Sequence, residues 1–302
     1  MEHTPIGNSP LSSSRLIYGC MRLSGLKSTK AVAATLAATV DAGYNHFDHA
    51  DIYGSGECES LFGEWLAANP SIRDKCVITT KAGIRFADTP KQGDPFRYDF
   101  SANYILQQAE ASLKRLQIET IDLFLLHRPD YLFHPEEVAG AFEKLHKDGK
   151  VRHFGISNFR TSQVELLAKA CPMPLINHQI EINLHQISSL EDGTLDQCLL
   201  HNMTPTAWCP LGALAYPAWG NTFSAEDEKR IETEVQRQAE AYKAKPSQIA
   251  LAWILKLPSK VLPIIGSTKP DRIREAVRAL ELNYSKEDWY RLLEARNGLR
   301  LP

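Results

Sequence analysis

Residues 45–57, NHFDHADIYGSGE, bring together side chains that could transfer protons or bind a metal. The run holds two histidines and two aspartates, followed by a tyrosine: His46, Asp48, His49, Asp51 and Tyr53. Imidazole and carboxylate are usual ligands of zinc or iron, so the spacing suits a divalent metal. The same residues could form a proton-transfer site, or a polar strand end with no chemistry. The run alone does not decide among these interpretations.

Short apolar runs rich in β-forming residues alternate with helical patterns along the chain. We expect eight strands, which begin near Arg15, Tyr44, Cys76, Ile121, Val151, Leu175, Thr204 and Val261. Helical patterns cover residues 30–42, 57–68, 102–116, 135–148, 162–170 and 195–202, and four more helices follow residue 208. Ser28 or Thr29 is a candidate N-cap of the first helix, and Gly43 is a candidate left-handed residue after its end.

Eight strand and helix pairs without a linker or a break in composition predict a single (β/α)8 barrel, a TIM barrel of the α/β class with extra C-terminal helices. This one domain would cover residues 1–302. The strands are apolar on both faces, as in a parallel sheet enclosed by helices. The alternative is a doubly wound open sheet, but no G-x-G-x-x-G follows the first strand.

The balance of charged residues limits which binding partners are expected. Lys and Arg number 34 against 36 Asp and Glu, and this balance gives no field suited to nucleic acid or an anionic membrane. A small molecule is therefore the expected partner, and the oligomeric state stays open between a monomer and a simple homo-oligomer. The six cysteines are far apart and read as free thiols. No signal peptide or membrane span is apparent, so we expect a soluble, cytoplasmic protein.

In a barrel of this kind the active site forms where the strands end, so polar residues at strand ends are the candidates for chemistry. Every expected strand from the second onward ends in a polar, aromatic or glycine residue: Asp48, Lys81, His127, Ser157 and Asn158, Gln179, Trp208, and Gly266 with Ser267. Each alone has a simple structural explanation, such as a solvated lysine or a packed histidine. Their recurrence at the same end of the barrel favours a shared site.

At these positions the chain resembles the aldo-keto reductases, and within them the YdhF-type bacterial oxidoreductases. The segments FDHADIYG, TTKAG, DLFLLHRPD and GKVRHFGISNF occur in the family's order, and the last is the most specific of the four. DGTLDQ and LPIIGS suggest the YdhF-type group. The resemblance extends over essentially the whole chain. It implies an enzyme that uses a nicotinamide cofactor to reduce an aldehyde or a ketone.

The resemblance implies a catalytic tetrad of Asp48, Tyr53, Lys81 and His127. Hydride arriving at a carbonyl carbon leaves an alkoxide that needs a proton, and we expect Tyr53 to donate it. Lys81 is expected to lower the pKa of the Tyr53 phenol, while Asp48 holds Lys81 charged and oriented. His127 would hydrogen-bond the carbonyl oxygen.

The resemblance also assigns cofactor contacts. It implies that Ser157, Asn158 and Gln179 hold the nicotinamide carboxamide, that Trp208 stacks on the ring, and that the backbone at Leu211 and Gly212 meets the pyrophosphate. Around the segment GSTKPDRIREA, it places Ser267, Lys269 and Arg272 near the adenosine 2′-phosphate, and Glu275 toward the adenine. A planar guanidinium suits phosphate, so NADP(H) is predicted over NAD(H). Gly266 stands where many relatives have a phosphate-binding lysine.

The sequence suggests candidate walls of the substrate pocket but no particular substrate. Met21 stands where several relatives place a tryptophan, so this wall is expected to be adaptable. The loops 84–100 and 128–134 should shape the rest, with four aromatic residues as candidate walls: Phe86, Tyr131, Phe133 and Trp219.

Two further hypotheses come from other functional classes. One is a metal-dependent barrel hydrolase that uses His46, Asp48, His49 and Asp51, although it leaves Lys81 without a role. The other is a regulatory subunit that binds the cofactor with little turnover. On the reductase hypothesis no metal is needed, His46 is packed inside the barrel, and His49 and Asp51 support the turn that presents Tyr53.

Overall fold

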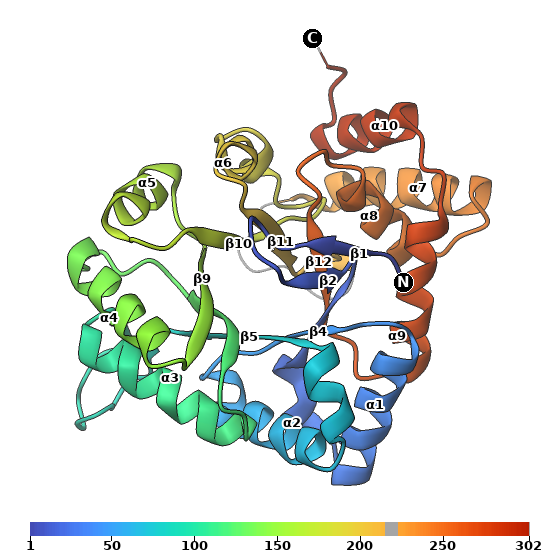
Figure 1. Cartoon of the computed structure of the whole chain (residues 1–302). Coiled ribbons are helices and arrows are strands. Elements are labelled where there is room, and N and C mark those ends of the chain that lie inside the picture. The colour runs from blue at the N-terminus through green and yellow to red at the C-terminus, as the bar shows by residue number, and fades with distance from the viewer. Residues whose placement is uncertain (215–222, 302) are drawn as a thin grey trace.

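Eight parallel strands close into a barrel surrounded by helices in the computed structural model (Figure 1). The structure describes residues 1–214 and 223–301. Around the barrel the order is β10, β11, β12, β3, β4, β5, β8 and β9. The strands are β3 (Ile17–Gly19), β4 (His46–Asp48), β5 (Val77–Ala82), β8 (Ile121–Leu126), β9 (Val151–Ser157), β10 (Leu175–Glu181), β11 (Thr204–Trp208) and β12 (Leu262–Ile265). The predicted (β/α)8 barrel is confirmed.

The outer layer is helical, as the sequence pattern predicts. The α-helices are α1 (Thr29–Asp41), α2 (Glu57–Ala67), α3 (Ala102–Leu116), α4 (Pro135–Lys147), α5 (Thr161–Ala170), α6 (Thr194–Leu200), α7 (Ala225–Ala241), α8 (Pro246–Leu255), α9 (Pro270–Val277) and α10 (Lys286–Asn297). Short 3-10 helices are η1 (Cys20–Gly25), η2 (Tyr53–Gly56), η3 (Pro70–Lys75), η4 (Ser188–Leu190), η5 (Gly212–Leu214) and η6 (Arg278–Glu281). The extra helices α7 and α10 lie side by side, and Arg237 of α7 pairs with Asp288 of α10 at 2.8 Å (Figure 1).

The predicted boundaries of α1 agree with its local chemistry. Ser28 has extended backbone angles, and its hydroxyl accepts a hydrogen bond from the Ala31 amide at 3.2 Å. This contact satisfies one of the amides that a helix start leaves unpaired. Gly43 follows the helix with a φ of +87°, a conformation that glycine adopts without the steric cost of a Cβ atom.

Strands β5 and β8 are buried on both faces. Every residue of β5 and β8 is buried, as expected for a parallel sheet enclosed by helices. Aromatic rings fill the space between sheet and helices, and the Phe142 ring of α4 stacks on Phe154 of β9 with centroids 4.1 Å apart. Such packing holds the strand ends in fixed positions, which a catalytic site needs.

An N-terminal hairpin that the sequence patterns did not predict closes one end of the barrel. Strands β1 (His3–Pro5) and β2 (Ser12–Ser14) pair antiparallel and lie across the barrel in Figure 1. Ser13 contacts His46, the first residue of β4, and the Gly7 amide donates to Thr204 Oγ1 at the start of β11. The hairpin therefore covers the amino ends of the strands. A second short hairpin, β6 (Ile84–Arg85) and β7 (Arg97–Tyr98), lies within the loop 84–100.

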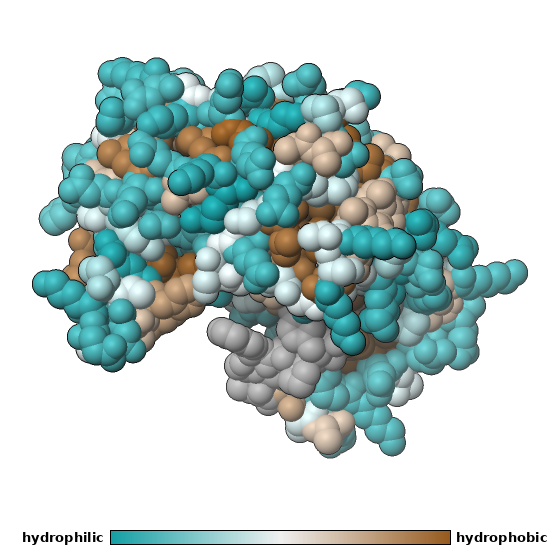
Figure 2. Space-filling model, turned by 90° about the horizontal axis from the view of Figure 1, so that it is seen from below, coloured by the Kyte–Doolittle hydropathy of each residue, from teal (hydrophilic) through white to brown (hydrophobic). Residues whose placement is uncertain are grey.

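The face of the molecule shown in Figure 2 is mostly hydrophilic, with hydrophobic side chains in separate groups between the polar ones. Among the helices of residues 1–214 and 223–301, none is long and apolar enough to cross a membrane.

Candidate active site

The four residues of the predicted tetrad gather at the carboxyl ends of neighbouring strands. Asp48 is the last residue of β4, Lys81 lies next to the end of β5, and His127 directly follows β8. Tyr53 begins η2, the short helix after β4. Because β4, β5 and β8 are adjacent in the barrel, these residues from distant parts of the sequence come together.

Asp48 and Lys81 form a buried ion pair at the centre of this group. Lys81 Nζ lies 2.7 Å from Asp48 Oδ1, and the Lys81 side chain has no exposed surface. Lys81 also donates to the His49 carbonyl oxygen at 2.6 Å, and Gln179 Nε2 donates to Asp48 Oδ2 at 2.7 Å. A buried ion pair is tolerated when its remaining hydrogen-bonding atoms are also satisfied. Both carboxylate oxygens of Asp48 have a donor, so the pair is fixed in one orientation.

Tyr53 lies against this ion pair. Lys81 Nζ is 5.1 Å from the centroid of the Tyr53 ring, and the His127 ring stands edge-on to it with centroids 6.0 Å apart. Burial raises the pKa of the Tyr53 hydroxyl well above its ordinary value, and the negative charge of Asp48 raises it further. The Lys81 ammonium beside the ring acts in the opposite direction, and the lowering of this pKa that we expect from Lys81 stays a prediction. The phenol stays protonated near neutral pH, as a proton donor must.

His127 is a neutral imidazole in this structure. Burial lowers its pKa well below the ordinary value, and the charges of Lys81 and Arg128 lower it further. Its Nδ1 atom is buried without a hydrogen-bond partner among the described residues. A neutral imidazole can donate one hydrogen bond to a substrate oxygen without competing for the proton that Tyr53 carries.

The histidines and aspartates of the opening run do not converge on a metal site. His46 lies at the amino end of β4, where its ring nitrogens contact Ser13 Oγ at 2.9 Å and Thr79 Oγ1 at 2.7 Å. His49 packs its ring against Phe62, with centroids 4.6 Å apart. In the part of the chain that the structure describes, no group of three or more His, Cys, Asp or Glu residues is placed to hold a metal ion. The hypothesis of a metal-dependent hydrolase has no geometric support.

The predicted nicotinamide contacts form a connected network next to His127. Asn158 Nδ2 donates to the His127 carbonyl oxygen at 3.2 Å and to Ser157 Oγ at 2.8 Å, while Trp208 Nε1 donates to Asn158 Oδ1 at 2.9 Å. Asn158 has a φ of +61°, a conformation that asparagine tolerates better than most residues. Ser157, Asn158 and Trp208 are therefore held together as a unit, and the Arg128 guanidinium lies 5.2 Å from the Trp208 ring centroid.

Gln179 and Gly212 each donate a hydrogen bond within the protein from a group that could otherwise contact a cofactor. One N–H of Gln179 is donated to Asp48, so Gln179 orients the ion pair, and its second N–H and its oxygen are left for a carboxamide. The Gly212 amide donates to the Cys209 carbonyl oxygen at 2.9 Å within a tight turn, while Leu211 packs against the core. A contact from Gly212 to a pyrophosphate would have to share that amide.

At the end of β12, Gly266 adjoins an arginine that sequence reasoning missed. Arg22 of η1 donates from Nη1 to the Gly266 carbonyl oxygen at 2.9 Å. A Cβ atom at position 266 would stand only 2.9 Å from the same Nη1 atom. The guanidinium thus occupies the space where a side chain at 266 would begin. Arg22 is next to Met21, which the sequence assigned to the substrate pocket, and this position could have indicated a role at the site. Its partner Gly266 lies 244 residues away, so the contact itself has no local signal.

The other predicted phosphate contacts surround the start of α9. The Ser267 hydroxyl accepts from the Lys269 amide at 3.2 Å, and Tyr18 donates to the Ser267 carbonyl oxygen. Lys269 and Arg272 are exposed, and neither makes an ion pair among the described residues. Glu275 pairs with Lys245 at 2.5 Å, so its carboxylate is already engaged before any contact with an adenine. A basic surface with a helix N-terminus is therefore present.

The expected pocket walls have different surroundings. Phe133 packs against Phe100 and Phe159 and is part of the loop packing. Tyr131 is 74% exposed, and Met21 is 49% exposed, so either can adapt to a substrate. Trp219 lies outside the described residues.

Comparisons with known proteins identify the family of this chain. The model of the aldo/keto reductase family matches residues 15–297. Oxidoreductase YdhF of Escherichia coli is 38% identical, over 96% of this chain and 95% of its own. The 6-dehydroglucose reductase of Novosphingobium aromaticivorans is 38% identical, over 98% of this chain and 96% of its own. The solved structure of the thermostable aldo-keto reductase Tm1743 aligns with a TM-score of 0.82 at 24% identity, covering 98% of this chain and 100% of its own, and supports the fold.

Proposed function

Because the chain belongs to the aldo/keto reductase family, we propose that it is an NADP(H)-dependent oxidoreductase that reduces an aldehyde or a ketone to an alcohol. The observation that carries this proposal is the buried Asp48–Lys81 ion pair beside the Tyr53 ring and His127. An ion pair at the carboxyl end of a barrel, with a phenol and a neutral imidazole against it, suits proton transfer to a reduced carbonyl.

Each side chain then has one role. Tyr53 gives its proton to the oxygen of the reduced carbonyl, because an alkoxide is a far stronger base than a phenolate even when the pKa of Tyr53 is raised. Lys81, held by Asp48, places a positive charge beside the Tyr53 ring and stabilises the phenolate that remains. Gln179 fixes the second oxygen of Asp48. His127 donates a hydrogen bond that positions and polarises the carbonyl oxygen.

A nicotinamide cofactor would supply the hydride, since no side chain can. The residues present fit such a group. Asn158 is held by the His127 carbonyl oxygen and by Trp208, and it donates in turn to Ser157, so the polar groups of both residues have fixed positions for a carboxamide. Trp208 offers an indole surface for a ring, next to the Arg128 guanidinium.

NADP(H) rather than NAD(H) is proposed because cations surround the end of β12. Arg22 reaches Gly266 from the first loop, and we assign to it the role that a lysine at position 266 has in many relatives. Lys269 and Arg272 are exposed at the start of α9, where backbone amides also favour an anion. A guanidinium binds phosphate through a planar pair of donors, which suits the adenosine 2′-phosphate.

The substrate is a small carbonyl compound. The relatives from Novosphingobium aromaticivorans and Agrobacterium fabrum are both named 6-dehydroglucose reductase, at 38% and 34% identity. Sugar aldehydes and ketones therefore belong in the first set of substrates, beside simple aromatic and aliphatic aldehydes.

A thermal-shift comparison of NADPH and NADH, followed by carbonyl-dependent NADPH oxidation, tests the proposal. A ligand that binds only the folded chain raises the melting temperature, so NADPH should give the larger shift at equal concentration. NADPH oxidation should require an added carbonyl compound and should be indifferent to chelators. A larger shift with NADH would overturn the assignment of Arg22 and Arg272. Absence of turnover with every carbonyl tested would favour the cofactor-binding regulatory subunit.

A further inference from the structure

A cavity of about 340 Å³ lies behind the turn that carries Tyr53, between η2, α3 and the start of the loop 84–100. Its polar lining includes Asp51, Arg85, Thr89, Gln107, Gln108 and Arg115, and we call it the Asp51 pocket. None of the four tetrad residues lines it. Its volume falls within the range of small-molecule sites. Phe86, which the sequence suggests as a wall of the substrate pocket, lines the Asp51 pocket, but the tetrad does not, so the proposed reaction assigns this cavity no role.

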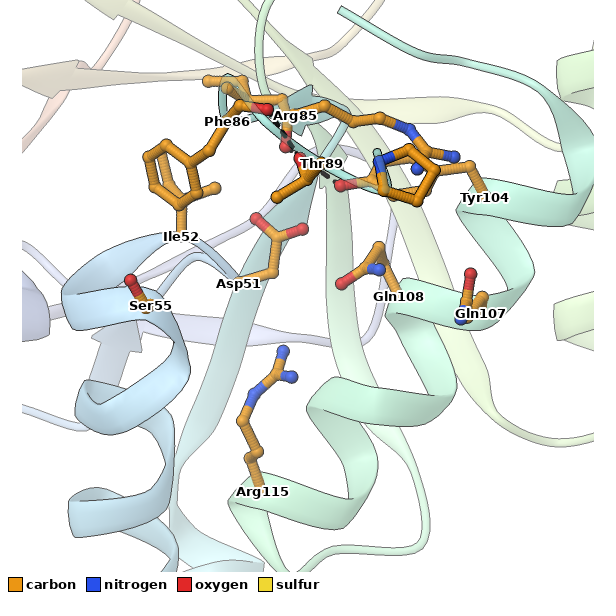
Figure 3. A pocket seen from close by; sticks show the side chains of 12 residues that line it. Asp51, Ile52, Ser55, Arg85, Phe86, Thr89, Tyr104, Gln107, Gln108 and Arg115 are labelled. Carbon is orange, nitrogen blue, oxygen red and sulfur yellow. Dashed lines mark hydrogen bonds between the residues drawn. The ribbon is translucent and has the colours of Figure 1, made fainter. Parts of the chain in front are cut away.

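Asp51 is the feature that points to a ligand. Its side chain is buried, at 7% exposure, and its Oδ1 atom has no hydrogen-bond partner among the described residues. Figure 3 shows the carboxyl group directed into the cavity, between Thr89 and Gln108. A buried polar atom without a partner costs free energy, and native proteins usually satisfy such atoms. A molecule in the cavity with hydroxyl groups could supply the missing partner.

The charges around the Asp51 pocket favour a neutral ligand. Arg115 pairs with Glu59 at 2.7 Å, and Arg85 pairs with Asp99 at 2.6 Å. Burial and the Glu59 charge raise the pKa of Asp51 to about 8, so this carboxyl is mostly protonated at neutral pH. A cation would meet the two arginines of the lining, and an anion would find both of them already paired with carboxylates. A neutral molecule brings no charge that would have to be buried without a partner.

The remaining walls suit a molecule with both polar and apolar faces. The amide side chains of Gln107 and Gln108 come from α3, and each can donate and accept hydrogen bonds. Phe86 and Ile52 line the other side in Figure 3, and Phe86 is 41% exposed. Sugars and polyols combine hydroxyl groups with apolar C–H faces, and they match this division. We propose that the Asp51 pocket binds a neutral polyhydroxylated molecule, a monosaccharide or a polyol, at a site distinct from the active site.

Isothermal titration calorimetry on the full chain tests this proposal directly, with D-glucose as the cyclic probe and D-sorbitol as the open-chain probe. D-glucosamine and D-gluconate are the charged counterparts. We expect saturable binding of at least one neutral probe, at a ratio of one to one, and affinity at least tenfold weaker for both charged molecules. Binding of neither neutral probe, or tighter binding of a charged one, would overturn the proposal.

Two variants locate the bound molecule. Gln108→Leu and Thr89→Val remove polar groups that line the Asp51 pocket, and each should weaken binding of the neutral probe by about tenfold. Gln236→Leu, on the exposed face of α7, is the matched control and should bind like the wild type. Tyr53→Phe should also leave this binding unchanged. If Tyr53→Phe weakens binding and the two pocket variants do not, the sugar occupies the barrel mouth, and the proposal of a separate site fails.

Discussion

Asp48 and Asp51 are three residues apart and both buried, yet their surroundings are opposite. Asp48 ends β4 inside the barrel, where Lys81 and Gln179 satisfy both carboxylate oxygens. Asp51 faces outward between η2 and α3, where one oxygen has no partner among the described residues and Glu59 adds a like charge. A short turn thus presents the Asp48 carboxylate to Lys81 and the Asp51 carboxyl group to the Asp51 pocket. The difference shows that the surroundings, rather than the residue type, decide what a buried aspartate can do.

The largest effect is expected from removing the partner of Asp48. Lys81→Met keeps the side-chain volume but leaves the Asp48 charge buried without its cation. Breaking a buried ion pair in this way costs about 3–5 kcal/mol. We expect a loss of this size in the free energy of unfolding, measured by urea denaturation, together with loss of activity. The double variant Lys81→Met with Asp48→Asn should recover part of the stability and none of the activity. Wild-type stability of Lys81→Met would contradict the buried pair.

Arg22→Ala tests the other charged contact of the barrel mouth. A hydrogen bond to a charged group contributes about 1.5–3 kcal/mol, so removing the guanidinium beside Gly266 should weaken NADPH binding about tenfold or more. NADH binding should change less, and Arg22→Lys should be intermediate. Tryptophan fluorescence titration measures the dissociation constants of NADPH and NADH for the wild type and for both variants. The control Arg300→Ala removes an exposed arginine elsewhere and should bind NADPH normally. Equal losses for NADPH and NADH would exclude a role for Arg22 at the 2′-phosphate.

Asp51→Asn should act in the opposite direction to Lys81→Met. The pKa of Asp51 is about 8 in the folded chain, raised from an ordinary value of 3.8. Between these values the unfolded chain loses the proton while the folded chain keeps it, so the contribution of Asp51 to stability falls as pH rises from about 4 to about 8. The variant should therefore gain about 1 kcal/mol or more over wild type at pH 8, and little at pH 4.

The matched control for this comparison is Asp74→Asn, which changes an exposed aspartate in η3. It should leave the difference in stability between pH 4 and pH 8 as in the wild type. If Asp51→Asn behaves like the control in urea denaturation at both pH values, Asp51 is not held neutral by its surroundings.

The smallest expected effect concerns His127. Burial and the charges of Lys81 and Arg128 lower its pKa well below the ordinary value, so it stays neutral at and above mildly acidic pH. The pH profile of kcat should therefore show no inflection near pH 6.5, the region where an ordinary histidine titrates. A clear inflection there, absent in a His127→Gln variant with residual activity, would show that the imidazole titrates during catalysis.

Much of the fold and of the site could be predicted from the sequence because strand ends are local features. The polar residue that ends each apolar run identified Asp48, Lys81 and His127 without knowledge of their contacts, and the alternation of elements indicated the barrel. The N-terminal hairpin was missed because its strands have three residues each, too few for a periodic signal.

The contacts that the sequence could not supply depend on which way a side chain points. Gln179 donates to Asp48, which lies 131 residues away in the sequence. The pKa of Tyr53 is raised chiefly because the phenol is buried, and burial depends on the whole fold. Arg22 meets Gly266 across the closure of the barrel between β12 and β3. The Asp51 pocket joins three segments that no sequence motif connects.

Tyr53→Phe tests the central claim most directly, because it removes only the hydroxyl that should deliver the proton. General acid catalysis contributes about 10²–10⁴-fold, so kcat for carbonyl reduction should fall by that factor. The NADPH dissociation constant from fluorescence titration should stay near its wild-type value, since no cofactor contact is assigned to the phenol. A variant that binds NADPH normally and keeps wild-type turnover would contradict the assignment of Tyr53 as the proton donor.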